Sequence, residues 1–225
     1  MSTTPTRIDV ALVTYSELPL LYEDDHLLLD ALRGQGLRVE PAVWADPSVD
    51  WSSARMAIIR SPWDYNLRYA EFLAWVERVS SMTDLWNPAP VLRWNSHKSY
   101  LRDLEGRGIP IVPTLWLGMG EAVDLHGMMQ SHGWKECVVK PVVSLNAQNT
   151  IRVSKETIVE GQSHLDRMSR EHEMMVQPYM PSVETYGERS LVFIAGEWSH
   201  AVRRVPVLSQ GDDPYAAPSV EPAQD

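Results

Sequence analysis

Two lysines stand where the chain favours binding an anion. Lys140 ends the β-branched run Val138-Val139-Lys140-Pro141, and a polar loop follows before a second β-branched run begins. Lys98 comes directly after Asn95-Ser96-His97, at the expected start of a helix, where the helix dipole already favours anions. Each lysine taken alone is also compatible with a solvated side chain, because a long ammonium stem reaches water easily. Together they point to a site for a phosphorylated small molecule.

An extended segment and a carboxylate follow the second lysine. Val176-Gln177-Pro178-Tyr179-Met180 is expected to leave a strand as a hinge whose free N–H and C=O groups pair with the edge of a purine. The next polar stretch, Glu184-Thr185-Tyr186-Gly187-Glu188, places a carboxylate where it can accept hydrogen bonds from ribose hydroxyls. We expect the strands of Lys140 and Gln177 to be neighbours, with both side chains facing one cleft. The alternatives are an interdomain linker and a plain polar turn.

The first half of the chain alternates strands with helices. Apolar runs predict strands at 8–13, 37–44 and 56–59. Helices are expected from the acidic stretch Glu23–His26 to Gly34, and over 68–81. This alternation predicts a parallel α/β sheet. Pro41 in the second strand indicates either an edge position or an early end of that strand. The aromatic loop Arg60–Tyr65 then follows the carboxyl end of a strand, where such sheets collect ligands, although a packed aromatic turn is an equal alternative.

The second half follows a proline-rich extended linker at 109–114. Ser96 is expected to cap a helix from about His97 to Gly106 just before that linker. Strands are predicted at 115–117, 136–140, 150–153 and 174–177, and helices at about 121–132 and 155–170. The runs 190–194 and 197–203 flank Ala195-Gly196 and predict a β-hairpin. From Pro206 onward we expect a disordered tail.

Composition excludes several classes of function. The chain has 225 residues, 44% of them hydrophobic, and a formal net charge of −10, which supports a real core and argues against binding to nucleic acid or anionic membranes. Its one cysteine, Cys137, rules out a disulfide framework. The N-terminus lacks the apolar region of a signal peptide, and no window approaches the roughly 18 apolar residues of a membrane span. We therefore expect a cytoplasmic protein with no membrane partner, either monomeric or a homo-oligomer.

The order of these features resembles the ATP-grasp superfamily, and in particular its glutathione-synthetase-like bacterial branch. The resemblance is carried by RSPWDY, NPAPVLRWNSHKSYL, GIPIVPT, VVKPVVS and MVQPYMPSVETYGERSLVFIAGEWSHAVRR. Some relatives in this branch close the D-cycloserine ring or form amide bonds in natural products. The implied fold is α/β with an α+β lid. Its parts are a pre-ATP-grasp domain with a parallel sheet at 1–111, a lid subdomain at 112–188, the first hairpin of the C-terminal subdomain at 189–206 and a tail at 207–225.

The resemblance also implies how the nucleotide is held. Lys98 and Lys140 match the two lysines that contact phosphates in the family. Gln177 and Tyr179 match the hinge that reads adenine, largely through backbone groups. ATP is therefore the implied cofactor, and magnesium is implied with it.

Three further roles follow from the same resemblance. Glu188 matches the acid that binds ribose, with Glu184 as the less favoured choice. Arg203 or Arg204 would face the triphosphate or an acyl phosphate as the catalytic residue. The implied reaction is phosphorylation of a small-molecule carboxylate by ATP, followed by attack of an amine on the acyl phosphate.

Two departures from the family pattern affect these expectations. Relatives carry glycines in the loop after the strand-end lysine, in a pattern like SAGGRGT, whereas residues 144–150 read SLNAQNT. Relatives also continue past the hairpin into a segment whose acidic residues hold magnesium, and no such ligands are found here. The acids of the tail are expected to be solvated charges: Asp212, Asp213, Glu221 and Asp225. The ligase is therefore expected to be truncated or inactive, and the alternative is a non-catalytic nucleotide- or partner-binding remnant of the fold.

Overall fold

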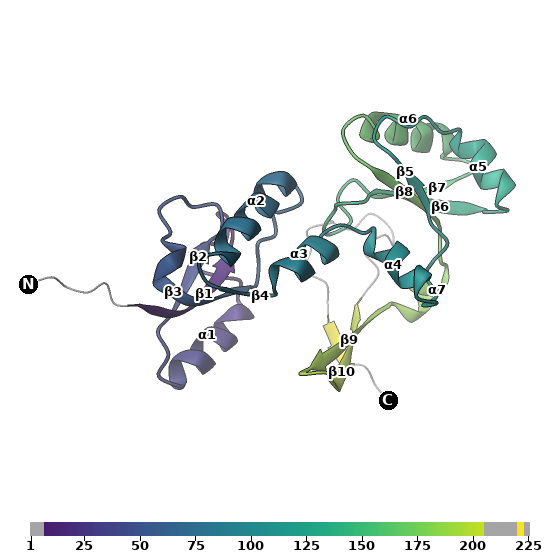
Figure 1. Ribbon diagram of the computed structural model, residues 1–225. Helices are drawn as coiled ribbons and strands as arrows, with labels where there is room; N and C mark the ends of the chain where they lie inside the picture. The colour runs from purple at the N-terminus through teal and green to yellow at the C-terminus, as the bar shows by residue number, and fades with distance from the viewer. Residues whose placement is uncertain (1–6, 205–219, 223–225) are drawn as a thin grey trace, which may run out of the picture. The chain divides into compact units, whose positions relative to one another are not determined.

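The computed structural model describes residues 7–204 and 220–222. The chain forms two compact units, Met1–Tyr100 and Leu101–Asp225, each with its own core (Figure 1). The boundary between the units falls after Tyr100. The sequence predicts it after residue 111, in the extended segment that follows helix α4 (Tyr100–Gly106). Within the described ranges, no helix combines the length and the apolar character that crossing a membrane requires.

The first unit is built on a four-stranded parallel sheet in the order β2-β1-β3-β4. Its strands are β1 (Ile8–Thr14), β2 (Val39–Val43), β3 (Ala54–Ile59) and β4 (Asp84–Trp86). Its helices are α1 (Asp25–Gly34), the short 3-10 helix η1 (Trp51–Ser53), α2 (Tyr69–Ser80) and α3 (Ala89–Asn95). The predicted α/β class is confirmed, and so is the edge position of the strand that contains Pro41.

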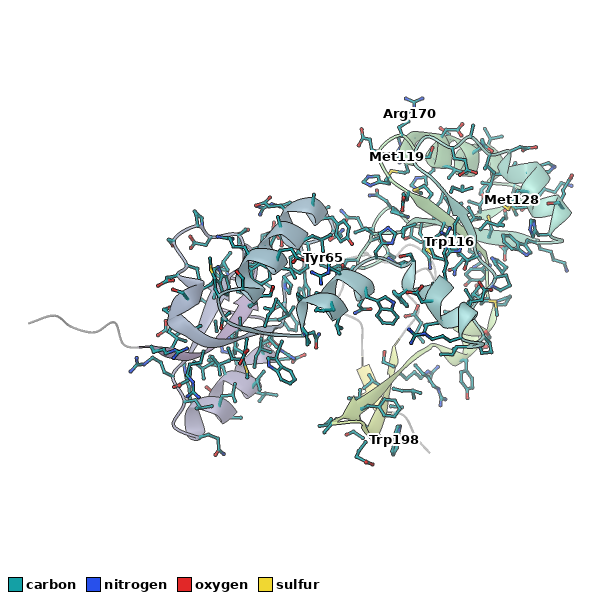
Figure 2. All side chains as sticks on the ribbon, in the orientation of Figure 1. Tyr65, Trp116, Met119, Met128, Arg170 and Trp198 are labelled. Atoms are coloured by element: carbon teal, nitrogen blue, oxygen red, sulfur yellow. The ribbon has the colours of Figure 1, made fainter. Side chains whose placement is uncertain are left out.

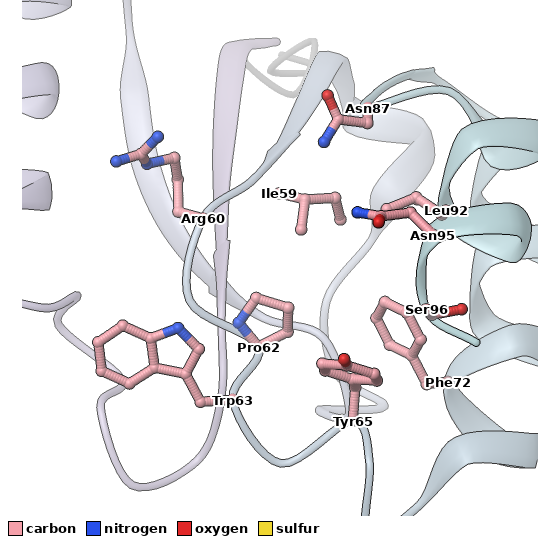
Figure 3. A pocket seen from close by; sticks show the side chains of 10 residues that line it. All are labelled: Ile59, Arg60, Pro62, Trp63, Tyr65, Phe72, Asn87, Leu92, Asn95 and Ser96. Atoms are coloured by element: carbon pink, nitrogen blue, oxygen red, sulfur yellow. The ribbon is translucent and has the colours of Figure 1, made fainter. Parts of the chain in front are cut away.

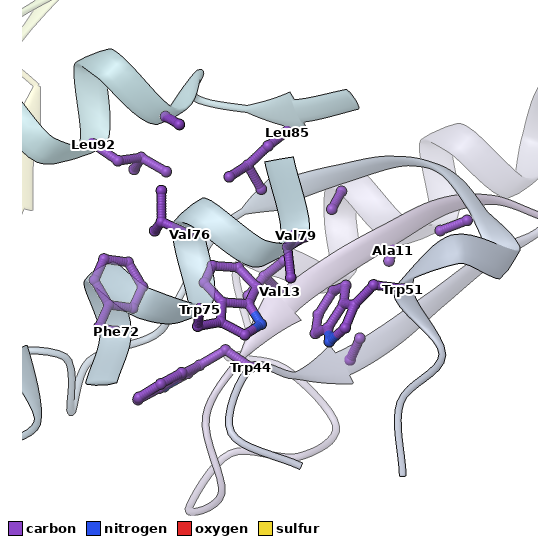
Figure 4. Close-up of a cluster of buried hydrophobic side chains, with 14 residues drawn as sticks. Ala11, Val13, Trp44, Trp51, Phe72, Trp75, Val76, Val79, Leu85 and Leu92 are labelled. Atoms are coloured by element: carbon purple, nitrogen blue, oxygen red, sulfur yellow. The ribbon is translucent and has the colours of Figure 1, made fainter. Parts of the chain in front are cut away.

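Helices cover both faces of this sheet, so β1 is buried on both sides. Its side chains alternate: Ala11 and Val13 join the core on the α2 side, whereas Val10 and Leu12 pack with Leu29 of α1. Figure 4 shows the core on the α2 side, where aromatic rings of α2 meet tryptophans from the loops beside the sheet. Burial on both faces explains why β1 reads as a continuous apolar run rather than an alternating one.

Three elements of the first unit are missing from the sequence prediction: the short 3-10 helix η1, strand β4 and helix α3. Strand β4 has three residues, too few for a periodic signal. Helix α3 was not predicted because prolines usually break helices. Here Pro88 precedes the helix and Pro90 lies in its first turn, where proline is tolerated. The expectation that Ser96 starts a helix is wrong: Ser96 ends α3, and α4 (Tyr100–Gly106) begins after an intervening turn.

The second unit holds a four-stranded antiparallel sheet in the order β5-β8-β6-β7. Its strands are β5 (Leu115–Leu117), β6 (Glu136–Pro141), β7 (Ile151–Ser154) and β8 (Met174–Pro178). The helices α5 (Leu125–Ser131) and α6 (Ile158–Met168) pack on one face through a core that contains Cys137, Val139 and Val176. On the opposite face, the guanidinium of Arg102 of α4 lies over the ring of Trp116, 4.6 Å from the ring centre (Figure 2 labels Trp116).

A short helix and a hairpin follow this sheet. Helix α7 (Ser182–Tyr186), which the sequence did not predict, leads into β9 (Glu188–Ile194) and β10 (Glu197–Arg204). The predicted hairpin is confirmed, and its turn uses left-handed backbone at Ala195 and Gly196, as a two-residue hairpin loop requires. The tail prediction is wrong for three residues, because β11 (Val220–Pro222) pairs with β10 and places Glu221 opposite Arg203. The remainder of the tail lies outside the described residues.

Candidate nucleotide-binding site

Lys140 and Gln177 lie on the same face of the β5-β8-β6-β7 sheet. In the register of β6 and β8, Val138 stands opposite Gln177, and Lys140 stands opposite Met175. Opposed residues, and residues two apart on one strand, point to the same side of a sheet. The two strands are direct neighbours and the two side chains share one face, as the sequence predicts. This is the face that α5 and α6 leave uncovered.

The ammonium group of Lys140 is partly withdrawn from water. Lys140 is half-buried, and Met175 opposite it is fully buried. Burial lowers the pKa of Lys140 below its ordinary value, and the nearby carboxylate of Glu188 opposes that shift by favouring the charged form. A desolvated cation near a single carboxylate has unused capacity for an anion. Lys140 therefore has the electrostatics that a phosphate-binding lysine needs.

The hinge after β8 is anchored at both of its predicted contact residues. Gln177 is 8% exposed, and its side-chain amide donates a hydrogen bond of 2.8 Å to Oγ1 of Thr114. The backbone N–H of Tyr179 donates to the carbonyl of Glu136 at 3.0 Å. With the Gln177 side chain engaged in this way, it is the backbone beyond Tyr179 that remains to pair with a base. Among the described residues, the N–H of Met180 has no backbone partner.

Arg152 ties the hinge to helix α7. Its guanidinium forms a two-bond ion pair with Glu136, at 3.2 Å from Nε and 2.8 Å from Nη2, and donates to Glu184 at 2.6 Å from Nη1. It also stacks on the ring of Tyr179 at 3.6 Å, and the hydroxyl of Tyr179 donates to Glu184 at 2.8 Å. Sequence reasoning missed this cluster. The signal was available, because Arg152 faces outward between apolar Ile151 and Val153 on β7.

The contacts of this cluster distinguish the two carboxylates that are candidates for binding ribose, Glu184 and Glu188. Hydrogen bonds from Tyr179 and Arg152 lower the pKa of Glu184, so its carboxylate is charged and already bound within the protein. Glu188 stands at the start of β9, is exposed, and acts electrostatically on Lys140. The geometry therefore favours Glu188 as the acid that is available to a ligand, which agrees with the order of preference drawn from the sequence.

The two candidate catalytic arginines lie at the end of β10. Arg203 donates from Nε to the carbonyl of Tyr186 at 3.2 Å and from Nη2 to the carbonyl of Thr185 at 3.4 Å. It therefore binds the C-terminal carbonyls of α7 and holds that helix against the hairpin. The backbone of Arg204 pairs with that of Glu188 across the hairpin, and its side chain lies outside the described part of the structure. A catalytic role for either arginine stays a prediction.

Lys98 belongs to the first unit, in the turn between α3 and α4. It is half-buried there and two positions before the first residue of α4. The expectation that Lys98 lies in the opening turn of a helix is wrong, because α4 begins at Tyr100 and Lys98 lies in the turn before it. Its contact with phosphate stays a prediction.

Comparison with known proteins decides the family. The model of the N-terminal domain of D-cycloserine synthetase DcsG matches residues 10–87. The cycloserine biosynthesis protein DcsG of Streptomyces lavendulae is 36% identical over 204 residues, which cover 88% of this chain and 68% of the relative. The crystal structure of D-cycloserine synthetase DcsG aligns with a TM-score of 0.81 and 35% identity, over 89% of this chain and 69% of that one. The chain belongs to the DcsG family of ATP-grasp proteins.

More distant ATP-grasp structures share the fold. An ATP-grasp RimK domain protein from Sphaerobacter thermophilus aligns with a TM-score of 0.67 at 19% identity, over 87% of this chain and 72% of that one. Carboxyaminoimidazole ribonucleotide synthase from Aspergillus clavatus, solved as a complex with ATP, aligns with a TM-score of 0.59 at 13% identity, over 89% and 55%. At such identities these structures show the architecture alone, which is that of ATP-grasp proteins.

The loop between β6 and β7 departs from the glycine-rich pattern of ATP-grasp relatives. Three of its residues adopt left-handed backbone, Asn146 (φ 48°), Ala147 (φ 54°) and Asn149 (φ 55°). Consecutive turns close the loop, the second by a hydrogen bond of 2.9 Å from Thr150 N–H to the carbonyl of Ala147. Asparagine tolerates this conformation and alanine does so less readily. The absence of glycine can be read from the sequence, whereas the left-handed backbone of these three residues is a finding of the structure.

Magnesium ligands of the kind that ATP-grasp relatives use are not assembled in the described part of the chain. Within residues 7–204 and 220–222, no three His, Cys, Asp or Glu side chains come together as a metal site. Hard cations need several oxygen ligands, so the residues placed here do not fit the ion. The tail acids Asp212, Asp213 and Asp225 lie outside the described residues, and we derive no step through a metal.

Proposed function

We propose that the chain binds ATP on the face shared by Lys140 and Gln177 and uses it to ligate a carboxylate to an amine. The observation that carries this proposal is the β6–β8 register, which places a desolvated cation and an anchored hinge on one surface. In this arrangement Lys140 contacts phosphate oxygens, Glu188 accepts from the ribose, and the hinge backbone near Met180 pairs with adenine. Membership of an ATP-grasp family supports the same assignment.

The proposed chemistry has two balanced steps. A carboxylate oxygen of the first substrate attacks the γ-phosphorus of ATP, and ADP leaves. The amine nitrogen of the second substrate then attacks the carbonyl carbon of the acyl phosphate, inorganic phosphate leaves with the C–O electron pair, and the nitrogen loses a proton. The protein's part in such transfers is mostly placement and neutralisation of charge. Within the second unit, Lys140 and Arg203 or Arg204 would supply that positive charge.

The substrates of the proposed reaction are small molecules. The relative that defines the family is named for cycloserine biosynthesis, and ATP-grasp ligases act on small carboxylates and amines. A reaction that consumes ATP also fits a protein that works in the cytoplasm. Whether this chain forms a ring within one molecule or joins two molecules depends on the substrate.

Calorimetric titration with ATP tests the nucleotide site. Lys140→Ala removes a charge-assisted contact, so we expect at least about tenfold weaker binding of ATP. Lys135→Ala is the matched control, because Lys135 is exposed and precedes the opposite end of the same strand. Equal affinity for the wild type and Lys140→Ala would remove Lys140 from the phosphate site and with it the proposal.

A nucleotide-binding role without ligation is the second candidate, and the β6–β7 loop favours it. A left-handed alanine in place of glycine restricts how closely that backbone approaches phosphate. Release of ADP in the presence of amino-acid mixtures discriminates between the two functions. Sustained release supports ligation, whereas ATP binding with no release supports the second candidate.

A further inference from the structure

A histidine of helix α6 joins that helix to the loop between β6 and β7. Nε2 of His164 lies 3.0 Å from the carbonyl oxygen of Asn149, which is one of the three loop residues with left-handed backbone. His164 is half-buried, and α6 packs on the core of the second unit. The contact therefore connects an irregular loop to a regular element that is fixed by the core.

The partners of the imidazole ring define its tautomer. Nη2 of Arg167 lies 3.1 Å from Nδ1 of His164, and a guanidinium group offers donors only. Nδ1 must therefore accept, so the proton of the neutral ring is on Nε2, where it can be donated to the carbonyl of Asn149. The guanidinium is itself oriented, because its Nη1 donates to Sδ of Met168 at 3.3 Å. One tautomer thus satisfies both contacts of the ring.

The surroundings of the ring favour its neutral form. Burial lowers the pKa of His164 below its ordinary value. The hydrogen bond to Asn149 opposes this shift, and the positive charge of Arg167 adds to it. A protonated ring could not accept from Arg167, so the geometry and the charges select the same state. At neutral pH His164 is a neutral donor to the loop.

The peptide group between Asn149 and Thr150 is held at both of its ends. Its carbonyl oxygen accepts from His164 at 3.0 Å, and its N–H donates to the carbonyl of Ala147 at 2.9 Å. Left-handed conformations of residues other than glycine persist where surrounding contacts over-determine them. His164 supplies one of the contacts that keep Asn149 left-handed, at a φ of 55°.

A glycine allows α6 to approach the sheet closely enough for this contact. A Cβ atom at Gly161 would lie 2.5 Å from Cγ1 of Val153 on β7, so the helix packs on that strand with no side chain between them. His164 is three positions further along the same helix, which places it on the same side as Gly161. Strand β7 begins directly after Thr150. The close packing of α6 on β7 therefore sets the distance from His164 to the end of the loop.

We propose that His164 is a positioning residue for the nucleotide site, which holds the β6–β7 loop in the conformation that meets the phosphates. This role rests on the proposed function, because it requires the loop that follows Lys140 to contact the nucleotide. A loop that is already ordered loses less entropy when a ligand arrives, so the contact with Asn149 should raise the affinity for ATP. His164 acts through the loop and touches neither nucleotide nor substrate.

Two variants of similar bulk separate the hydrogen bond from packing. His164→Leu fills the space without a donor, whereas His164→Gln places an amide N–H near the position of Nε2. We expect His164→Leu to speed hydrogen exchange of the Thr150 amide and to weaken ATP binding in calorimetry, each several-fold, and His164→Gln to stay within about twofold of the wild type in both. His126→Leu is the matched control, because the hydrogen bond of His126 joins it to Gln130 of its own helix α5.

NMR spectra of the nucleotide-free chain report the tautomer and the integrity of the fold. We expect the ring proton of His164 on Nε2 at about pH 7. Two indole N–H resonances should keep their positions in every variant, those of Trp116 on β5, at the far edge of the same sheet, and of Trp63, which lines a pocket of the first unit (Figure 3). A loss of ATP affinity that comes with a shift at Trp116 would assign His164 to core packing and overturn the proposal.

Three further results would also contradict the proposal. These are a ring proton on Nδ1, unchanged exchange of the Thr150 amide in His164→Leu, and equal ATP affinity of His164→Leu and the wild type. The tautomer and exchange measurements contain no nucleotide, so their outcome is independent of the ATP experiment. A wild type that does not bind ATP would remove the proposed function and this role with it, whereas ATP binding by the wild type with unchanged exchange at Thr150 in His164→Leu would remove only the role of His164.

Discussion

Lys140 shows how a single side chain can be suited to binding at a cost in stability. Its ammonium group loses hydration on folding, and among the described residues Glu188 is the group that favours its charged form. In a purely structural role such a residue would be better replaced by an apolar one. Retaining a desolvated cation next to an anchored hinge is what a site for an anionic ligand requires, because the ligand supplies the missing counter-charge.

Replacing this cation should therefore stabilise the protein in a pH-dependent way. The pKa of Lys140 is lowered from 10.5 by burial, so between the lowered value and 10.5 the unfolded chain holds a proton that the native state has released. The stability of the wild type thus rises with pH through that window, and below it the full penalty applies. We expect Lys140→Met to be more stable than the wild type at about pH 7, with a difference that shrinks toward about pH 10.

Urea unfolding at both pH values measures this effect. Lys135→Met serves as the control and should show no pH-dependent gain, because Lys135 is exposed. A Lys140→Met protein that is less stable at neutral pH would show that the ammonium group is stabilised by the fold, contrary to the direction of its pKa shift.

Arg152 is the second residue with a testable role. It contacts Glu136, Tyr179 and Glu184 at once, so removing it leaves two carboxylates side by side without their cation. Because the pairs are partly exposed, we expect Arg152→Met to lower the free energy of unfolding by about 1–2 kcal/mol. The exposed pair of Arg93 with Glu77 gives the control, since Arg93→Met should cost less than about 0.5 kcal/mol.

The same substitution should also alter the hinge around Tyr179. Tyr179 loses the guanidinium stacked on its ring, and Glu184 loses its hydrogen bond from Arg152 while keeping the one from Tyr179. We expect weaker ATP binding in Arg152→Met, restored in part by Arg152→Lys, which keeps the charge but not the two-bond geometry. An Arg152→Met protein with wild-type stability and wild-type ATP affinity would show that the cluster is incidental.

At the scale of elements, the β6–β7 loop is the segment least suited to its proposed task. Three L-amino acids hold left-handed backbone where relatives use glycine, and Ala147 has no side-chain polar group to offset the strain. We expect the triple variant Asn146→Gly, Ala147→Gly and Asn149→Gly to bind ATP several-fold more tightly in calorimetry. The glycines would relieve the strain and let backbone N–H groups approach the phosphates.

Gln148 supplies the control within the same loop. It lies between the left-handed residues but does not share their conformation. Gln148→Gly therefore adds flexibility without relieving strain, and it should bind ATP no more tightly than the wild type. Tighter ATP binding in both variants would mean that the ATP affinity of the wild type is limited by too little flexibility in the loop, and not by the left-handed conformation.

At the scale of the whole molecule, the two units have separate cores. The proposed nucleotide face belongs to the sheet of β6 and β8 in the second unit. ATP should therefore protect amides of that unit. In hydrogen-exchange measurements we expect ATP to slow exchange in β6 and around Tyr179.

The strand β2 gives an internal reference, because it lies at the far edge of the first sheet. Its exchange should not change when ATP is added. Protection of β2 by ATP at the level of β6 would mean that the nucleotide acts on the first unit, and the assignment of the nucleotide to the second sheet would need revision.

The sequence by itself determined the features that rest on local periodicity. The order of the strand-end lysine and the hinge predicted that their strands are neighbours and that Lys140 and Gln177 face one cleft, although their shared face depends on the register that the structure shows. Pro41 indicated an edge or an early end of its strand, and the strand lies at an edge. The absence of glycine from the β6–β7 loop and the hairpin turn at Ala195-Gly196 could also be read from the sequence, because each residue type has its own backbone preference. Local patterns fell short where an element was very short or began with prolines, as with β4 and α3.

Only the tertiary structure decided which polar groups meet. Asp25 forms an ion pair with Arg60, and Arg152 forms one with Glu184. In each pair the partners are far apart in sequence and share no periodic pattern. The tertiary structure also decided that Val220–Pro222 pairs with β10. Such partners depend on strand order and register, which fix distances in space between residues that are remote in sequence. A charge can be read from the sequence, but whether another residue already neutralises it follows from the fold, and this separates the bound Glu184 from the available Glu188.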